Sequence, residues 1–449
     1  MSNSITTLLY FSYKCAAKFR SIFSSRITTF GYYALFSLPV LLLLSVVYLT
    51  ISTFYLLGVL VAAVVVSLIL SFFRRGKVKV ERVLPSYAVA NEALEYKVTC
   101  TNISSVSLSS AILLDSGPEV LPPRADFVSG VEPGEKLRNG FDRFFKYYRW
   151  MWHVKRKTKF TSKPIALPYL KKGERSDDFI LCKPTRRGKL YFNNATLLLP
   201  DPIGLFQKVK KISTYEESII VLPRRYRLSH LLLDGLSRFQ LGGESASRAN
   251  GQSEEMIGLR EYRPGDPVKH IHWRSWAKTA KPIVKEYEDV FFPRYGLVLD
   301  TACSYSRADV FEEAVSIASS FASSIDTKEC LLDLIFLNQG AKVQTVGKGI
   351  ARPDVILEFL ASVDIDTSPD WEGLRQKVAQ HTDSLTACIV ILVELDQERI
   401  SLIEQLKSSG MTIMVIVLFS DSAQEGVIIA HGAIPISMKS VQRDLLGRV

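Results

Sequence analysis

The feature that most constrains this chain is a run of 47 residues without a charged side chain, from Ile27 to Phe73. A helix that crosses the hydrocarbon core of a bilayer needs about 20 apolar residues, each adding a rise of about 1.5 Å. The run is therefore too long for one span and long enough for two. We predict a transmembrane hairpin, with helices at about residues 31–49 and 53–73. A cleaved signal peptide has an apolar region of only about 7–15 residues, which argues against that alternative.

Basic residues flank the apolar run on both sides, and residues 1–80 contain no Asp or Glu. The positive-inside rule places both flanks in the cytoplasm. We therefore expect a basic cytoplasmic segment over residues 1–30, with both chain termini and the soluble domains on the cytoplasmic side of the membrane. Much of the net charge of +11 comes from this end of the chain. This distribution argues against a broadly basic nucleic-acid binder, so no nucleic acid is expected as a partner.

The stretch from residue 78 to residue 225 is predicted to form a β-rich domain. Segments such as VKVERV and EYKVTCTN alternate apolar and polar side chains, as strands with one buried face do. Several short strands at this spacing are typical of an antiparallel β-sandwich.

An insertion at residues 126–163 interrupts these strands, and its part from 142 to 163 is rich in aromatic and basic residues. Three interpretations remain open. The stretch forms a membrane-surface element with its cations on anionic lipid, a nucleic-acid strip with stacking rings, or an extended hairpin whose rings pack on the sheet. The residues assigned to the membrane-surface interpretation are Arg149, Trp150, Trp152, Lys155, Arg156 and Lys157.

Residues 226–290 combine a linker with the most distinctive motif of the chain. The linker contains a Gly/Ser-rich segment at 236–253, which predicts a flexible loop. The motif follows as EMIGLREYRPGDPVKHIHWRSWAKTAKPIVKEYE, and its Pro-Gly-Asp-Pro sequence predicts a turn. Arg260 and Asp266 are spaced to pair across this turn, and Trp273 and Trp276 offer large areas for burial. Three roles remain open for the motif: a structural clasp, a surface that senses a partner or a nucleotide, and catalysis.

This motif resembles that of the family called domain of unknown function 58, which comprises membrane-anchored bacterial proteins. The residues that carry the resemblance are Arg260, Tyr262, Gly265, Asp266, Ile271, His272, Trp273 and Ala277. Lys269 and Lys278 stand where the family usually has Arg, which keeps the charge but loses a bidentate fork. The resemblance implies a multi-pass protein of the bacterial cytoplasmic (inner) membrane.

Residues 291–449 are predicted to form an α/β domain. Near-continuous Val/Ile/Leu strands, such as ACIVIL, alternate with amphipathic helices, which indicates a mostly parallel sheet with helices on both faces. The resemblance implies a von Willebrand factor A-like domain, in which an Asp-x-Ser-x-Ser sequence holds a divalent ion. Here Asp300 and Ser304 match, but Ala302 replaces the first Ser, so any Mg²⁺ site is degenerate. The alternative is that Asp300 caps the turn after its strand.

The sequence contains no phosphate-binding loop, and no two of its six cysteines have the spacing of a zinc or redox motif. We therefore expect a non-enzymatic adaptor or scaffold without a required cofactor. The resemblance implies a MoxR-type AAA+ ATPase as its partner, in protein assembly or cell-envelope maturation. Two alternatives remain: a Mg²⁺-dependent regulatory or enzymatic protein that uses Asp300, and an anionic-lipid-binding module at residues 142–163. The sequence leaves the oligomeric state open.

Overall fold

A computed structural model describes residues 2–48, 50–115, 121–132, 134–228, 256–287, 294–325, 331–337, 341–347, 353–382, 385–410, 412–420 and 424–447. The predicted flexible loop at residues 236–253 lies outside these ranges. The chain divides into two compact units, one built mainly from residues 1–224 and the other mainly from residues 225–449.

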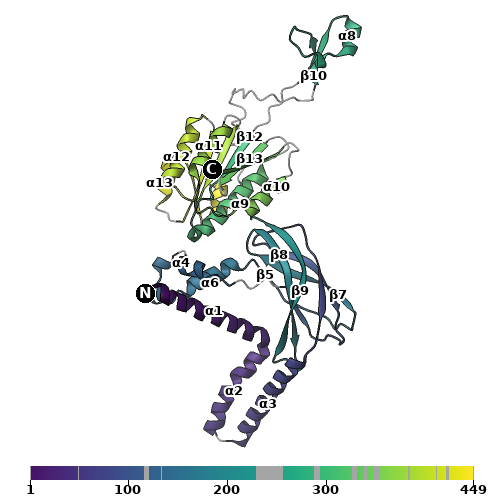
Figure 1. The fold of residues 1–449 in the computed structure, drawn as a ribbon, viewed down its shortest axis with the longest axis vertical. Helices are drawn as coiled ribbons and strands as arrows, with labels where there is room; N and C mark the ends of the chain where they lie inside the picture. The colour runs from purple at the N-terminus through teal and green to yellow at the C-terminus, as the bar shows by residue number, and fades with distance from the viewer. Residues whose placement is uncertain are drawn as a thin grey trace. The chain divides into compact units, whose positions relative to one another are not determined.

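Three helices open the first unit: α1 (Ser2–Arg26), α2 (Thr29–Tyr48) and α3 (Ile51–Phe73). Helices α2 and α3 lie side by side as a hairpin (Figure 1). Both are long and apolar enough to cross a membrane, with mean hydropathy of 2.0 and 2.9. The prediction of two apolar helices is confirmed, and each helix begins two residues before the predicted start. The segment predicted to be a basic N-terminus, residues 1–30, is mostly helical, because α1 occupies nearly all of it.

A two-sheet sandwich follows the hairpin, as predicted for residues 78–225. One sheet has the strand order β1-β3-β7-β5, and the other has the order β2-β9-β8-β4-β6. All neighbours are antiparallel except β2 and β9, which run parallel. The strands are β1 (Val78–Val83), β2 (Tyr87–Val89), β3 (Leu94–Asn102), β4 (Ile112–Asp115), β5 (Phe160–Ser162), β6 (Ile165–Ala166), β7 (Arg175–Pro184), β8 (Gly188–Pro200) and β9 (Gln207–Leu222).

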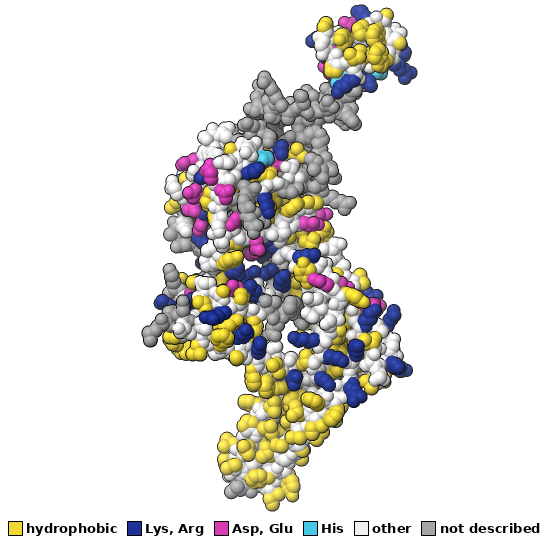
Figure 2. Space-filling model, in the orientation of Figure 1, with side chains coloured by type: hydrophobic (Ala, Val, Ile, Leu, Met, Phe, Trp, Pro, Cys, Tyr) yellow, Lys and Arg dark blue, Asp and Glu magenta, His cyan; other side chains and the backbone are white. Residues whose placement is uncertain are grey.

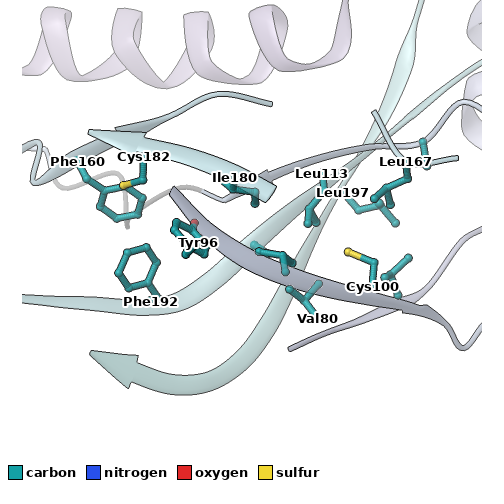
Figure 3. Packing of buried hydrophobic residues seen from close by; sticks show 14 of the residues in the cluster. Val80, Tyr96, Cys100, Leu113, Phe160, Leu167, Ile180, Cys182, Phe192 and Leu197 are labelled. Atoms are coloured by element: carbon teal, nitrogen blue, oxygen red, sulfur yellow. The ribbon is translucent and has the colours of Figure 1, made fainter. Parts of the chain in front are cut away.

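The core of the sandwich is built from the alternate residues that each strand turns inward. Strand β3 buries every second side chain, from Tyr96 through Val98 to Cys100. Figure 3 shows Tyr96, Phe192 and Phe160 grouped at one end of this core, with Leu113 and Leu197 further along it. The two-residue period of the sequence therefore translates directly into the packed layer between the sheets.

A buried ion pair connects the two sheets inside this apolar layer. The Arg82 guanidinium on β1 donates two hydrogen bonds to the Asp115 carboxylate on β4, at 2.6 and 2.9 Å. The Tyr96 hydroxyl donates a third to the same carboxylate, at 2.8 Å. Because both charged side chains are almost fully buried, each depends on the other for compensation of its charge.

The insertion between β4 and β5 is helical, so the interpretation as an extended hairpin is wrong. It contains α4 (Arg124–Ser129), a 3₁₀ turn η1 (Glu135–Leu137), α5 (Gly140–Phe145) and α6 (Tyr147–Lys157). Asn139 caps α5 by accepting a hydrogen bond from the Asp142 N–H at 2.8 Å. Three consecutive basic residues complement the dipole of the last turn of α6. The helical period that places one side of α6 in the interior is hidden in the sequence by the density of basic residues.

In the second unit, the motif residues form a small module of their own. Strands β10 (Met256–Glu261) and β11 (Ile283–Tyr287) pair antiparallel. The connection between them contains a 3₁₀ turn, η2 (Val268–His270), and helix α8 (Trp273–Thr279).

The α/β domain contains a six-stranded sheet of order β14-β13-β12-β15-β16-β17. Strand β14 is antiparallel to β13, and all other neighbours run parallel. The prediction of a mostly parallel sheet is confirmed. The strands are β12 (Arg294–Leu299), β13 (Leu331–Leu337), β14 (Ala341–Gly347), β15 (Ala387–Leu392), β16 (Thr412–Phe419) and β17 (Ile434–Ser437).

Helices cover both faces of this sheet. Every residue of β15 is buried, which requires cover on each side. On one face the sheet packs against α11, α12 and α13 (Figure 1). The helices are α9 (Ala308–Ser324), α10 (Pro353–Ser362), α11 (Trp371–Thr382), α12 (Gln397–Ser408), α13 (Glu425–Ala430) and α14 (Val441–Gly447).

Candidate functional site

The motif module is organised around one ion pair across its turn, as the sequence predicts. Arg260, at the end of β10, donates to both carboxylate oxygens of Asp266 at 2.7 and 2.8 Å. The Arg263 N–H donates to the same carboxylate at 2.8 Å. Gly265 has a φ of 109°, a backbone conformation that a residue with a Cβ rarely adopts. The turn therefore needs both the charge pair and the glycine.

The charge pair also fixes the protonation state of Asp266. The hydrogen bonds from the Arg260 guanidinium, together with the one from the Arg263 backbone, lower the pKa of Asp266 to about 2. The carboxylate is thus ionised at physiological pH, the state in which it accepts these hydrogen bonds.

Around this clasp, the other motif residues hold the backbone in place. Tyr262 pairs through its N–H with the Pro282 carbonyl at 2.9 Å. Ile271 is buried, and His272 contacts the Ser275 hydroxyl through Nδ1 at 2.7 Å, at the start of α8. Ala277 and Lys278 lie exposed on α8. The contacts of Tyr262, Ile271 and His272 thus lie within the module.

The tryptophans of the motif depart from the sequence prediction. Trp273 is 61% exposed, and its ring stacks on that of Trp276 with centroids 5.4 Å apart. Val268 and Leu259 on the same module are also largely exposed. A module of this size has too little interior to enclose two indole rings. The expected burial of Trp273 is therefore wrong, and the module exposes apolar side chains instead. We call Leu259, Val268, Trp273 and the half-buried Trp276 the Trp273 surface.

Asp300, at the carboxyl end of β12, is held by four donors. Its two oxygens accept from the Arg399 guanidinium at 2.7 and 3.3 Å. They also accept from the N–H groups of Ala302 at 2.9 Å and Val393 at 3.1 Å. The bond to Ala302 is the turn cap expected as the alternative to a metal site. Burial raises the pKa of Asp300, against the lowering by Arg399 and the two N–H groups.

Arg399 is the centre of this cluster. It is 1% exposed, although it lies in the first turn of α12. Besides Asp300 it pairs with Glu394 and Asp396, and it donates to the Ala302 carbonyl. Its guanidinium lies over the ring of Trp371, 4.9 Å from the centroid. Nothing in the sequence around residue 399 marks it, because a surface helix usually carries exposed arginines.

The residues at Asp300 do not fit Mg²⁺. A carboxylate has about four lone-pair sites, and here all four face N–H donors. A guanidinium already supplies the positive charge, and Ser304 is exposed while Asp300 is buried. In the described part of the chain, no group of three or more His, Cys, Asp or Glu side chains is placed to hold a metal. The cation at this strand end is Arg399.

Two of the six residues assigned to a membrane surface lie in the interior. Arg149 pairs with Glu135 and donates to the Phe127 carbonyl at 3.2 Å, and Trp150 packs against Tyr10 and Phe127. They hold α6 to α1 and α4, so their assignment to the surface is wrong. Lys155 is exposed, whereas Trp152, Arg156 and Lys157 are half-buried.

Helix α1 carries an apolar stripe that the sequence analysis misses. The exposed side chains of this stripe recur every three or four residues, at Ile5, Leu8, Phe11, Cys15, Phe19 and Ile22, and Phe23 lies next to the last of them. The opposite side of α1 packs through Tyr10 and Tyr13 on the insertion. Figure 2 shows hydrophobic side chains covering the hairpin and gathering again along α1. The helical spacing and the lack of any acid in residues 1–26 were the available signals.

Comparisons with known proteins assign neither a family nor an activity to the chain. No family model matches the chain. The uncharacterized protein YeaD of Bacillus subtilis (strain 168) is 23% identical over 221 residues, which cover 49% of this chain and 54% of that protein. The chain thus spans about half the length of this curated relative.

Similar solved structures are remote. The CARDB domain of a Pyrococcus furiosus protein in complex with di-metal ions has a TM-score of 0.16 and 11% identity, covering 33% of this chain and 96% of that chain. The GH20 exo-β-N-acetylglucosaminidase of Vibrio harveyi in complex with N-acetylglucosamine has a TM-score of 0.16 and 10% identity, covering 77% of this chain and 57% of that chain. Neither similarity is close enough to assign a fold or an activity.

Proposed function

We propose that this protein is a membrane-anchored, non-enzymatic adaptor of the domain of unknown function 58 family, with a von Willebrand factor A-like domain at its C-terminal end. The α2–α3 hairpin anchors the chain in the cytoplasmic membrane, and the soluble domains lie on the cytoplasmic side. The partner is a protein, for which the family resemblance suggests a MoxR-type AAA+ ATPase. Assembly or maturation of cell-envelope proteins is the corresponding role.

The observation that carries the proposal is the Trp273 surface, on the same module as the turn fixed by the Arg260–Asp266 pair. Exposed aromatic side chains on a pre-organised backbone are typical of the few residues that dominate protein–protein affinity. A structural clasp and a docking surface are then two aspects of one motif. The clasp holds the turn after β10, and α8 of the same module carries the indoles.

Basic side chains at the base of the hairpin support the proposed orientation. Arg74, directly after α3, donates to the Pro200 carbonyl at 2.9 Å and to the Ser109 carbonyl at 2.7 Å. The Lys208 ammonium donates to the Phe72 carbonyl at 2.9 Å, at the last turn of α3. Cations gathered at one end of a hairpin favour the cytoplasmic side.

The test is binding of the full chain, reconstituted in nanodiscs, to the purified MoxR-type ATPase of the same organism. Trp273→Ala should weaken binding by about 30-fold, the equivalent of about 2 kcal/mol for a central aromatic contact. Val427→Ala is the matched control, because Val427 is also an exposed apolar side chain but lies on α13. Equal affinity of the two variants for the ATPase would show that the Trp273 surface is not the docking site. If the native chain does not bind the ATPase, the ATPase is not the partner.

A further inference from the structure

A cleft of about 750 Å³ lies within the first unit, between α1, α6 and the β8–β9 strands. Its volume is in the range of about 300–1,000 Å³ that is typical of small-molecule sites. On the α1 side the cleft is lined by small residues, Ala16 and Ala17. Apolar side chains line it elsewhere: Met151 and Val154 of α6 and Leu190 of β8. Part of the cleft lining is thus apolar.

Three cations lie among the residues that line this cleft. Arg20 comes from α1, Lys157 ends α6, and Lys159 follows it. Lys157 also pairs with Asp126 at 3.3 Å, and the cleft contains one acid, Glu216. The lining therefore has an excess of positive charge beside its apolar walls, which suits a ligand with an anionic head and an apolar tail.

One end of the cleft is next to the membrane hairpin. Ser24 and Ser25 line it, and α2 begins at Thr29. The Ser25 carbonyl accepts from the Gln207 side chain at 2.9 Å, and the Thr28 N–H donates to the Leu205 carbonyl at 3.1 Å. These bonds connect the end of α1 to the sandwich just before α2 begins. This end of the cleft therefore lies beside the start of the apolar hairpin.

We propose that this cleft binds one anionic phospholipid, with the phosphate of its headgroup paired to Arg20, Lys157 and Lys159. Part of an acyl chain lies along Met151, Val154 and Leu190. The proposal rests on the membrane anchoring put forward above, and it goes beyond it by naming a specific lipid class and site. The bound lipid would join α1 to α6 and so stabilise the layer that connects the hairpin to the sandwich.

The test uses the full chain, extracted in mild detergent and examined by native mass spectrometry with dioleoylphosphatidylglycerol, dioleoylphosphatidylcholine or glycerol phosphate. The native chain should retain one phosphatidylglycerol and bind it at least 10-fold more tightly than phosphatidylcholine. The triple variant Arg20→Gln/Lys157→Gln/Lys159→Gln should lose this preference. The control Lys171→Gln/Lys172→Gln/Lys183→Gln removes the same charge from exposed positions outside the cleft and should keep it.

A second variant tests the apolar part of the site without changing any charge. Ala16→Trp puts an indole into the cleft from the exposed side of α1 and should also abolish retention of the lipid. Equal retention in the triple variant and its control would overturn the proposal, and so would equally tight binding of glycerol phosphate. Failure of the anchoring itself is distinguishable, because the native chain would then be released from membranes by alkaline carbonate without detergent.

Discussion

The Arg399–Asp300 pair gives the sharpest test of how the α/β domain is held together. Both side chains are about 1% exposed, and Asp300 accepts two of the Arg399 hydrogen bonds. Arg399→Met removes the guanidinium but keeps an unbranched apolar side chain of similar length. The Asp300 carboxylate then stays buried with two backbone N–H donors and no compensating cation.

The expected cost follows from the burial of the pair. Removal of one partner of a buried ion pair destabilises a protein by about 3–5 kcal/mol. For a domain of this size, about 1 kcal/mol corresponds to about 2–4 °C in Tm, so the α/β domain should melt about 6–20 °C lower. Arg375→Met is the matched control, because Arg375 pairs with Glu372 and Glu398 at the surface, where such pairs contribute about 0–1 kcal/mol.

The assay is thermal unfolding of the full chain in detergent, together with hydrogen exchange that locates the change. Amides of β12, β15 and α12 should exchange faster in Arg399→Met, while those of the sandwich should not change. Similar melting temperatures for Arg399→Met and Arg375→Met would refute this reasoning. So would a rise in native Tm with Mg²⁺ that Asp300→Asn abolishes, because the carboxylate would then be available to a metal.

Three further predictions concern the other buried or clasped groups. Burial lowers the pKa of His153 to about 4 from its ordinary 6.5, so the packing of α6 should weaken as the pH falls from about 6.5 through 4. Hydrogen exchange of residues 147–157 should become faster over this range. His153→Gln should remove this dependence on pH. The pKa of Asp266 is about 2 against an ordinary 3.8, so the turn should hold above about pH 4 and loosen as the pH falls through 2. Indole fluorescence of the native chain should follow this change, whereas that of Asp266→Asn should not depend on pH in this range. A flat native profile would contradict the prediction. Arg82→Met should destabilise the sandwich by about 3–5 kcal/mol in chemical unfolding, and Arg82→Met/Asp115→Leu should recover much of the loss, because the second change removes the unpaired charge.

The long-range architecture was predictable because its signals are long and regular. The charge-free run from Ile27 to Phe73 predicts two helices, and the continuous apolar strands of residues 295–419 predict a mostly parallel sheet. The pairing of Arg260 with Asp266 was also predictable, since a Pro-Gly-Asp-Pro turn brings these two positions together. In each case the signal is a regular pattern within a single stretch of sequence.

Features that depend on tertiary contacts were not predictable. Arg399 becomes a buried cation only because β12 ends beside α12, and residues 300 and 399 are far apart in the chain. Arg149 lies in a basic stretch that is typical of a surface, yet its bonds to Glu135 and to the Phe127 carbonyl hold it in the interior. Conversely, Trp273 is expected from the sequence to be buried, yet it is exposed because its module has almost no interior.

The measurement that tests the adaptor proposal most directly is photo-crosslinking in living cells from a photoreactive residue placed at position 273. The account predicts a crosslink to a cytoplasmic MoxR-type ATPase from position 273 and none from position 427. Crosslinks only to proteins on the outer side of the cytoplasmic membrane, or the same products from both positions, would contradict it.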